Sequence, residues 1–135
     1  MRYLGIDYGS KKVGIALSDD KGMMAFPKAV LPNDNFLMTE VKNLITGHGV
    51  DTVVIGESQD YQMKDNPIMK KARAFADELR RDIDVEVVFE PELLSSHQAT
   101  HFQGKTAMID ASAASIILQS FIDRQKKDIP YESDY

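Results

Sequence analysis

The stretch GIDYGSKKVGIALS, residues 5–18, decides the fold, because its pattern predicts two strands joined by a short turn. The runs RYLGIDYG (2–9) and VGIALS (13–18) are strand-like, and the residues between them favour a hairpin. The first run carries a carboxylate, Asp7, between an isoleucine and a tyrosine. A carboxylate in a half-buried strand is costly unless something compensates its charge. We therefore ask what compensates Asp7.

Downstream, predicted strands and predicted helices alternate. Further strands are predicted from apolar and β-branched runs over 23–31, 51–56 and 85–90. Helices are predicted from an N-cap at Asn33 or Asp34 to the glycines Gly47 and Gly49, from Pro67 to Arg81, from Ser95 or Ser96 onward, and over 109–125. Because Pro27 lacks a backbone donor, we expect the 23–31 strand at an edge of the sheet or at a bulge.

Three of the helices show apolar residues at helical spacing, which predicts their buried faces. The first face comprises Phe36, Leu37, Val41, Leu44 and Ile45; the second Ile68, Ala72, Phe75, Ala76 and Leu79; the last Ala113, Ile116, Ile117, Ser120 and Phe121. The order of elements predicts one α/β domain over residues 1–125, with a five-stranded mixed sheet, antiparallel at the start and parallel later. Residues 126–135 are polar, and we expect them to form a flexible tail.

The composition indicates a globular protein. Its 135 residues are 43% hydrophobic and 27% charged, which is near the average for soluble domains. No apolar run approaches the ~18 residues of a membrane span, and no secretory signal is visible, so we expect a cytoplasmic protein without a membrane partner. The chain has no cysteine. Its net charge of −5 argues against generic nucleic-acid binding, and residues 57–135 hold the excess acid, with 15 acidic against 10 basic side chains.

Three acidic residues occupy positions that suit a metal site. Asp7 lies in the first strand, Glu92 follows the last strand, and Asp110 opens the last helix. Ligands collect at the carboxyl ends of strands in open α/β sheets, so the three acids would converge if the first and fifth strands lie near each other. Oxygen ligands without cysteine or histidine favour Mg²⁺ or Mn²⁺. The simpler alternatives are a turn at Asp7, a surface position for Glu92 and a helix N-cap at Asp110.

The histidines are a weaker metal candidate. His97 and His101 are four residues apart, a spacing that suits metal binding on one face of a helix. No third ligand lies near them in the sequence, and His48 stands alone. We therefore expect surface or partly packed histidines.

Four segments of the chain together carry a family resemblance. They are GIDYGSKKVGIALSD (5–19), VVIG (53–56) followed by Pro67 and KKARAFADEL, VEVVFEPELLSSHQA (85–99) and IDASAASIILQSFID (109–123). Across residues 2–125 they resemble, in this order, the YqgF (RuvX-like) proteins of the ribonuclease H-like superfamily. The matching parts of that family are an opening aspartate motif, a central strand and helix, an Asp-Glu-Arg-Leu run with two hydroxyl residues, and a closing helix.

The resemblance implies a ribonuclease H-like fold and a metal-dependent endonuclease for structured nucleic acid. Its substrate would be precursor 16S ribosomal RNA or, alternatively, the Holliday junction of DNA recombination. Independently of the resemblance, we expect a monomer or homodimer. The resemblance assigns catalysis and the Mg²⁺ or Mn²⁺ ions to Asp7, Glu92 and Asp110. It implies substrate contacts at Gly9, Lys11, Lys12, Ser95 and Ser96. For the two lysines, a solvated turn is the alternative.

Departures from the family pattern leave a second interpretation open. Pro91 and Leu93 replace the acid and the arginine that flank the family's glutamate, Glu57 and Ser58 replace an apolar residue and a proline, and the connection before the last helix carries only Lys105. These changes remove substrate contacts and spare the metal acids. The alternative is a catalytically weakened nucleic-acid-binding or regulatory module of the same fold. A phosphotransferase ranks last, because sugar kinases with a similar hairpin enclose their nucleotide between two domains.

Overall fold

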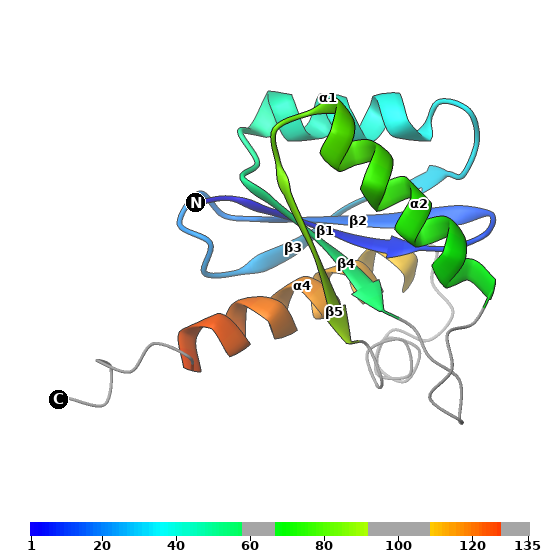
Figure 1. Cartoon of the computed structure of the whole chain (residues 1–135). Coiled ribbons are helices and arrows are strands. Elements are labelled where there is room, and N and C mark those ends of the chain that lie inside the picture. The colour runs from blue at the N-terminus through cyan, green and yellow to red at the C-terminus, as the bar shows by residue number, and fades with distance from the viewer. Residues whose placement is uncertain (58–66, 92–108, 128–135) are drawn as a thin grey trace, which may run out of the picture.

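The computed structural model describes residues 1–57, 67–91 and 109–127, with the side chains of 111–125 in the last range. These ranges contain strands β1 (Tyr3–Tyr8), β2 (Lys12–Ser18), β3 (Ala25–Pro32), β4 (Thr52–Glu57) and β5 (Glu86–Pro91), and helices α1 (Leu37–His48), α2 (Pro67–Asp82) and α4 (Ile109–Lys127) (Figure 1). The helix predicted from Ser95 or Ser96 lies outside the described residues. Of the predicted tail, residues 126 and 127 extend α4, and 128–135 are outside the description.

The strands form one mixed sheet in the order β3-β2-β1-β4-β5. β1 pairs antiparallel with β2, and β2 pairs antiparallel with β3. β1 pairs parallel with β4, and β4 pairs parallel with β5. The predicted architecture, an antiparallel start followed by parallel crossovers, is therefore confirmed. β3 is an edge strand, and its register with β2 shifts beside Pro27, so this proline lies both at an edge and next to an irregularity.

Helices cover both faces of the sheet. Figure 1 shows α1 and α2 on one face and α4 crossing the other. The α1–α2 side holds the larger core cluster, which includes Leu4, Ile6, Val41, Ile55 and Leu79. The α4 side holds a second cluster, in which Ala114, Ile117 and Leu118 pack near Ala16 and Val54. The central strands are thus apolar on both faces, as expected for parallel strands between layers of helices.

The start of α1 differs from the prediction. The helix begins at Leu37, with Phe36 at the N-cap and no side-chain capping bond. Asp34 instead accepts a hydrogen bond from the Phe36 backbone N–H at 2.9 Å, which forms a turn just before the helix. Phe36 is 71% exposed, so its predicted place on the buried face is wrong. The aromatic ring precedes the first helical turn and therefore does not follow the helical spacing.

Four more predicted core positions are not fully buried, and one of them is Leu44 of α1, which is partly buried against the core. In α4, Ile116 is half-buried and Ser120 is exposed. Both line an open hollow of about 540 Å³ together with Gln119, Asp123 and Arg124. In α2, Ile68 is half-exposed, whereas Met69 on the neighbouring position is buried. The apolar stripes of both helices are therefore rotated slightly from the predicted ones.

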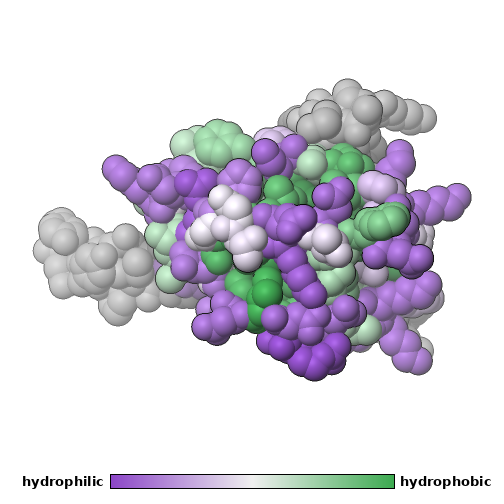
Figure 2. Space-filling model, turned by 90° about the horizontal axis from the view of Figure 1, so that it is seen from above, coloured by the Kyte–Doolittle hydropathy of each residue, from purple (hydrophilic) through white to green (hydrophobic). Residues whose placement is uncertain are grey.

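The outer surface is mixed in character. Figure 2 shows the molecule from above, the side on which α1 and α2 lie, and hydrophilic side chains dominate this face with small hydrophobic areas between them. None of the helices in the described ranges is both long and apolar enough to cross a membrane.

Candidate active site

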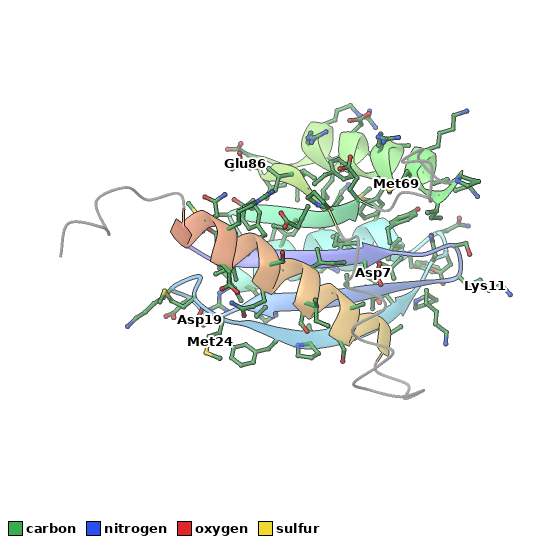
Figure 3. The ribbon with its side chains drawn as sticks, turned by 90° about the horizontal axis from the view of Figure 1, so that it is seen from below. Asp7, Lys11, Asp19, Met24, Met69 and Glu86 are labelled. Carbon is green, nitrogen blue, oxygen red and sulfur yellow. The ribbon has the colours of Figure 1, made fainter. Side chains whose placement is uncertain are left out.

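Asp7 lies near the carboxyl end of β1, the central strand of the sheet, and is half-buried. Its cross-strand partner on β2 is Gly14, which contributes no side chain. Residues two apart on a strand share a face, and Gly5 packs directly against Ala114 and Leu118 of α4. Asp7 therefore lies on the α4 face, and Figure 3 shows it toward the end of the sheet that also carries Lys11.

The first turn of α4 is brought to the same end of the sheet. At Gly5 the helix approaches so closely that a Cβ would lie 2.8 Å from the Leu118 Cβ and 3.0 Å from the Ala114 carbonyl oxygen. In Figures 1 and 3 the start of α4, drawn in yellow, lies at the end of the sheet that carries Asp7, and Figure 3 shows it toward the β3 edge. Asp110 is the second residue of α4, so its backbone belongs to this turn. Its side chain is outside the description.

The end of β5 reaches the same edge, one strand further away. β1, β4 and β5 are parallel, so their carboxyl ends share an edge, and β4 separates the other two strands. Two interstrand spacings amount to roughly 10 Å. β5 ends at Pro91, so Glu92 directly follows this edge in the chain. The side chains of Glu92, Ser95 and Ser96 fall outside the described residues.

Glu90 is a buried acid that the sequence analysis missed. It is 3% exposed and lies on the α4 face, where the Ser120 hydroxyl donates to it at 3.0 Å and an Arg124 Nη2 donates to it at 2.5 Å. Ile6 of β1 pairs with Ile55 of β4, so Asp7 is level with Gly56. Gly56 in turn pairs with Glu90 of β5, so Glu90 is level with Asp7 across the sheet. A carboxylate held by an arginine and a hydroxyl anchors α4 to β5. The sequence does contain a signal for Glu90: the alternation in VEVVFE (85–90) places Glu90 on the same face of the strand as Val88.

Glu57, which replaces an apolar residue of the family pattern, is the last residue of β4 and is half-buried. It is two residues from Ile55, which belongs to the core on the α1–α2 side. By strand alternation Glu57 therefore faces away from α4 and from the face that carries Asp7. Glu57 is therefore on the opposite face of the sheet from Asp7.

The β1–β2 turn is held in a fixed shape beside Asp7. A Cβ on Gly9 would meet the Lys12 carbonyl oxygen at 2.5 Å, so only glycine fits this close approach. Asn33, after β3, donates from its side chain to the Gly9 carbonyl oxygen at 2.8 Å and from its backbone to the Lys11 carbonyl oxygen at 2.9 Å. Asn33 therefore fixes the turn, a role that its prediction as a helix cap did not anticipate.

The two lysines of this turn are exposed, and they are oriented differently. Lys11 projects from the end of the sheet in Figure 3. Lys12 is two residues from Gly14, the partner of Asp7, so it shares the face of Asp7 and stands diagonally opposite it. Such diagonal neighbours have Cα atoms about 7–8 Å apart, within reach of a long side chain. Lys12 is thus a cation that the fold places beside Asp7.

The donors at this edge suit a hard divalent cation. Asp7 supplies carboxylate oxygens, the ligand type that Mg²⁺ and Mn²⁺ prefer. Within the described ranges no group of three or more His, Cys, Asp or Glu side chains is close enough to hold a metal ion. The other two predicted ligands, Glu92 and Asp110, have side chains outside those ranges. His97 and His101 also lie outside the described ranges.

Relatives of this chain share its full length. A family model described as "RuvX: Holliday junction resolvase" matches residues 1–124. A protein of Halothermothrix orenii, named "Putative pre-16S rRNA nuclease", is 31% identical over 94% of this chain and 98% of its own length. A protein of Oleidesulfovibrio alaskensis with the same name is 33% identical over 98% of this chain and 99% of its own length.

Solved structures agree on the fold. RuvC of T. thermophilus, in complex with a Holliday junction substrate, matches 93% of this chain and 96% of its own with a TM-score of 0.63 and 15% identity. The fowlpox virus Holliday junction resolvase matches 92% of this chain and 99% of its own with a TM-score of 0.56 and 16% identity. The fold is therefore the ribonuclease H-like fold of these resolvases. Together with the sequence matches, this shows that the chain belongs to the RuvX family.

Proposed function

We propose that this protein is a metal-dependent endonuclease that cuts phosphodiester bonds in precursor 16S ribosomal RNA. The observation that carries the proposal is the placement of Asp7, half-buried near the carboxyl end of the central strand, at the end of the sheet where α4 begins. Its full-length relatives named as pre-16S rRNA nucleases support the substrate class. The proposal places the protein in the cytoplasm, as a monomer or homodimer.

In this proposal Asp7, Glu92 and Asp110 hold Mg²⁺ or Mn²⁺. The strand order supports this set, since it directs the ends of β1 and β5 to one edge, where α4 also begins. Such ions, when bound, activate a water and stabilise the leaving oxygen of the cleaved phosphate. Asp7 contributes a fixed ligand because β1 is paired on both sides and α4 closes on Gly5.

Substrate contacts in this proposal come from the turn after Asp7 and the segment after β5. Lys12, on the face of Asp7, attracts the phosphate backbone, and Lys11 extends the positive charge beyond the sheet. Gly9 has no side chain, so the backbone of the turn can approach a substrate phosphate closely. Ser95 and Ser96 add hydroxyl donors. The net charge of −5 confines binding to this local patch.

A second candidate substrate is branched DNA. The family description names a Holliday junction resolvase, and the chain shares the fold of two such resolvases. A third possibility is a binding module with weakened cleavage, since Leu93 stands where the family carries an arginine. The RNA nuclease, the junction resolvase and the binding module can be distinguished by which substrate, if any, the purified protein cuts.

The test is cleavage of two labelled substrates, a precursor 16S rRNA fragment and a four-way DNA junction, with Mg²⁺ or Mn²⁺. We expect cleavage of the RNA, and Asp7→Asn should lower the rate by about 100-fold or more, since a metal ligand supplies several kcal/mol to the transition state. Asp20→Asn, at an exposed acid in the β2–β3 turn, is the matched control and should keep the wild-type rate. Cutting of the junction alone would support the second candidate, and binding without cutting the third.

A further inference from the structure

A second feature at the active-site end is a pocket of about 320 Å³ between the β1–β2 turn and the first turns of α2. The described residues that line it are Ser10, Pro67, Ile68 and Lys71. In Figure 3, Lys11 of that turn and Met69 of α2 lie at the same end of the molecule as Asp7. The volume is at the lower limit of pockets that bind small ligands.

The lining combines an apolar wall with one cation and one hydroxyl. Pro67 is exposed, and Ile68 is half-exposed although helical spacing predicted it in the core. An apolar side chain left open beside a pocket favours a flat or apolar ligand group. Lys71 is exposed and forms no ion pair with any carboxylate of the described ranges. The first turn of α2 carries no acidic residue. The pocket therefore suits an anionic ligand with a planar, partly apolar group.

The pocket lies on the α2 side of the sheet and Asp7 on the α4 side, so a nucleic-acid strand reaches both by crossing the end of the sheet between them. Ser10 is three residues from Asp7, so their Cα atoms are at most about 11 Å apart, since an extended chain spans roughly 3.6 Å per residue. Phosphates of a stacked strand follow one another at about 3.4 Å along the axis, so roughly three nucleotides cover this distance. A strand cut at Asp7 would place a nucleotide roughly three positions from the cut at the pocket.

We propose that this pocket binds one unpaired nucleotide of the substrate, close to the cleaved phosphate. The base packs against Pro67 and Ile68, and its phosphate is held by Lys71 and the Ser10 hydroxyl. A base stacked inside a duplex cannot enter a recess in a protein, whereas an unstacked base can. The inference rests on the proposed nuclease function and adds a preference for single-stranded flanks.

The test is binding of a fluorescein-labelled single-stranded RNA of about 12 nucleotides, a common site size for such strands, and of the same RNA as a duplex. EDTA is present so that no cleavage occurs. Lys71→Ala should weaken single-strand binding about fivefold and reduce the slope of log K against log salt by about 0.7, one phosphate contact. Duplex binding should change less than twofold. Lys70→Ala, an exposed neighbour on α2 that does not line the pocket, is the matched control.

A second variant tests the pocket without removing a lysine. Ser10→Asp places a negative charge at the pocket in an exposed turn position, and it should weaken single-strand binding at least as much as Lys71→Ala. Equal effects of Lys71→Ala and Lys70→Ala, equal losses on single strand and duplex, or no RNA binding by the wild type would each overturn the inference.

Cleavage measured in parallel separates this inference from the proposed function. If the wild type cuts RNA and Lys71→Ala binds single-stranded RNA as tightly as the wild type, the pocket proposal is wrong and the nuclease proposal stands. Selective loss of single-strand binding in a protein that cuts neither substrate would support the pocket and remove the nuclease proposal.

Discussion

At the residue scale, the ion pair between buried Glu90 and half-exposed Arg124 shows how this fold accepts a carboxylate inside a sheet. The Glu90 side chain is 4% exposed, and Arg124 is 50% exposed. The arginine therefore reaches from solvent to a buried acid, which Ser120 also binds. Removing one partner of such a pair leaves an uncompensated charge, whereas replacing both with apolar residues can be neutral.

We predict that Arg124→Ala lowers the free energy of unfolding by about 2 kcal/mol, less than a fully buried pair would cost because Arg124 is half-exposed. The double variant Glu90→Leu, Arg124→Leu should regain most of that loss. Arg81→Ala is the control, since Arg81 is 69% exposed and its ion pair with Asp82 is 3.8 Å long, so it should change stability by less than about 0.5 kcal/mol. Urea unfolding measures all three, and equal losses in Arg124→Ala and Arg81→Ala would contradict the role of the pair.

Asp19 gives a prediction for the dependence of stability on pH. The backbone N–H groups of Met23 and Met24 donate to its carboxylate at 2.7 and 3.1 Å, which lowers the pKa of Asp19 below its ordinary value of 3.8. A lowered pKa in the folded state adds stability that is present above the unfolded value and is lost as the pH falls through the folded one. The β2–β3 turn should therefore weaken in acid.

The variant Asp19→Asn keeps a hydrogen-bond acceptor and cannot titrate. We predict that its urea midpoint falls less than that of the wild type as the pH is lowered below 3.8, the ordinary value for this carboxyl. Asp20→Asn, on the next and exposed residue, should follow the wild-type curve. Parallel curves for Asp19→Asn and the wild type would show that these two bonds do not depend on the charge.

At the scale of elements, the contact between α4 and β1 positions the site. Gly5 allows the helix backbone to lie directly on the strand. The carboxyl end of this strand carries Asp7, and the first turn of this helix carries Asp110. A change in the contact therefore moves one predicted metal ligand relative to another.

We predict that Gly5→Ala destabilises the protein by about 2 kcal/mol, since its Cβ would lie 2.8 Å from the Leu118 Cβ and 3.0 Å from a backbone oxygen. The nuclease rate should fall as well, because α4 must shift. Gly47→Ala, in α1, is the opposite case: no atom lies within 4 Å of its Cβ, so it should stabilise the helix by about 0.5–1 kcal/mol. Thermal unfolding compares the two, and a neutral Gly5→Ala would show that the contact is loose.

Most elements could be predicted from local patterns, and the errors lie where local patterns compete. Alternation and helical spacing identified every strand and helix in the described ranges. Asn33 and Asp34 resemble helix caps, but Asn33 holds the β1–β2 turn and Asp34 accepts a hydrogen bond in the turn just before α1. Ser120 and Ile68 follow the helical period, but each lines an open hollow at the surface.

At the scale of the whole molecule, the site could be predicted only in part. Asp7 was identified because an acid in a strand breaks the apolar pattern. Its relation to the end of β5 depends on β4 lying between the two strands, and strand order follows from long-range packing that local sequence does not encode. Glu90 escaped notice for the same reason, since its partner Arg124 lies in a distant helix. The metal-binding roles of Asp7, Glu92 and Asp110 all remain predictions.

The central claim is that Asp7, Glu92 and Asp110 bind divalent metal at one edge of the sheet. The most direct measurement is a crystal structure after soaking in Mn²⁺, with anomalous density located near these residues. We predict an anomalous peak within about 2.3 Å of carboxylate oxygens from all three side chains, and its loss in Asp7→Asn crystals. A well-ordered structure without that peak, with Glu92 or Asp110 pointing away from Asp7, would contradict the account.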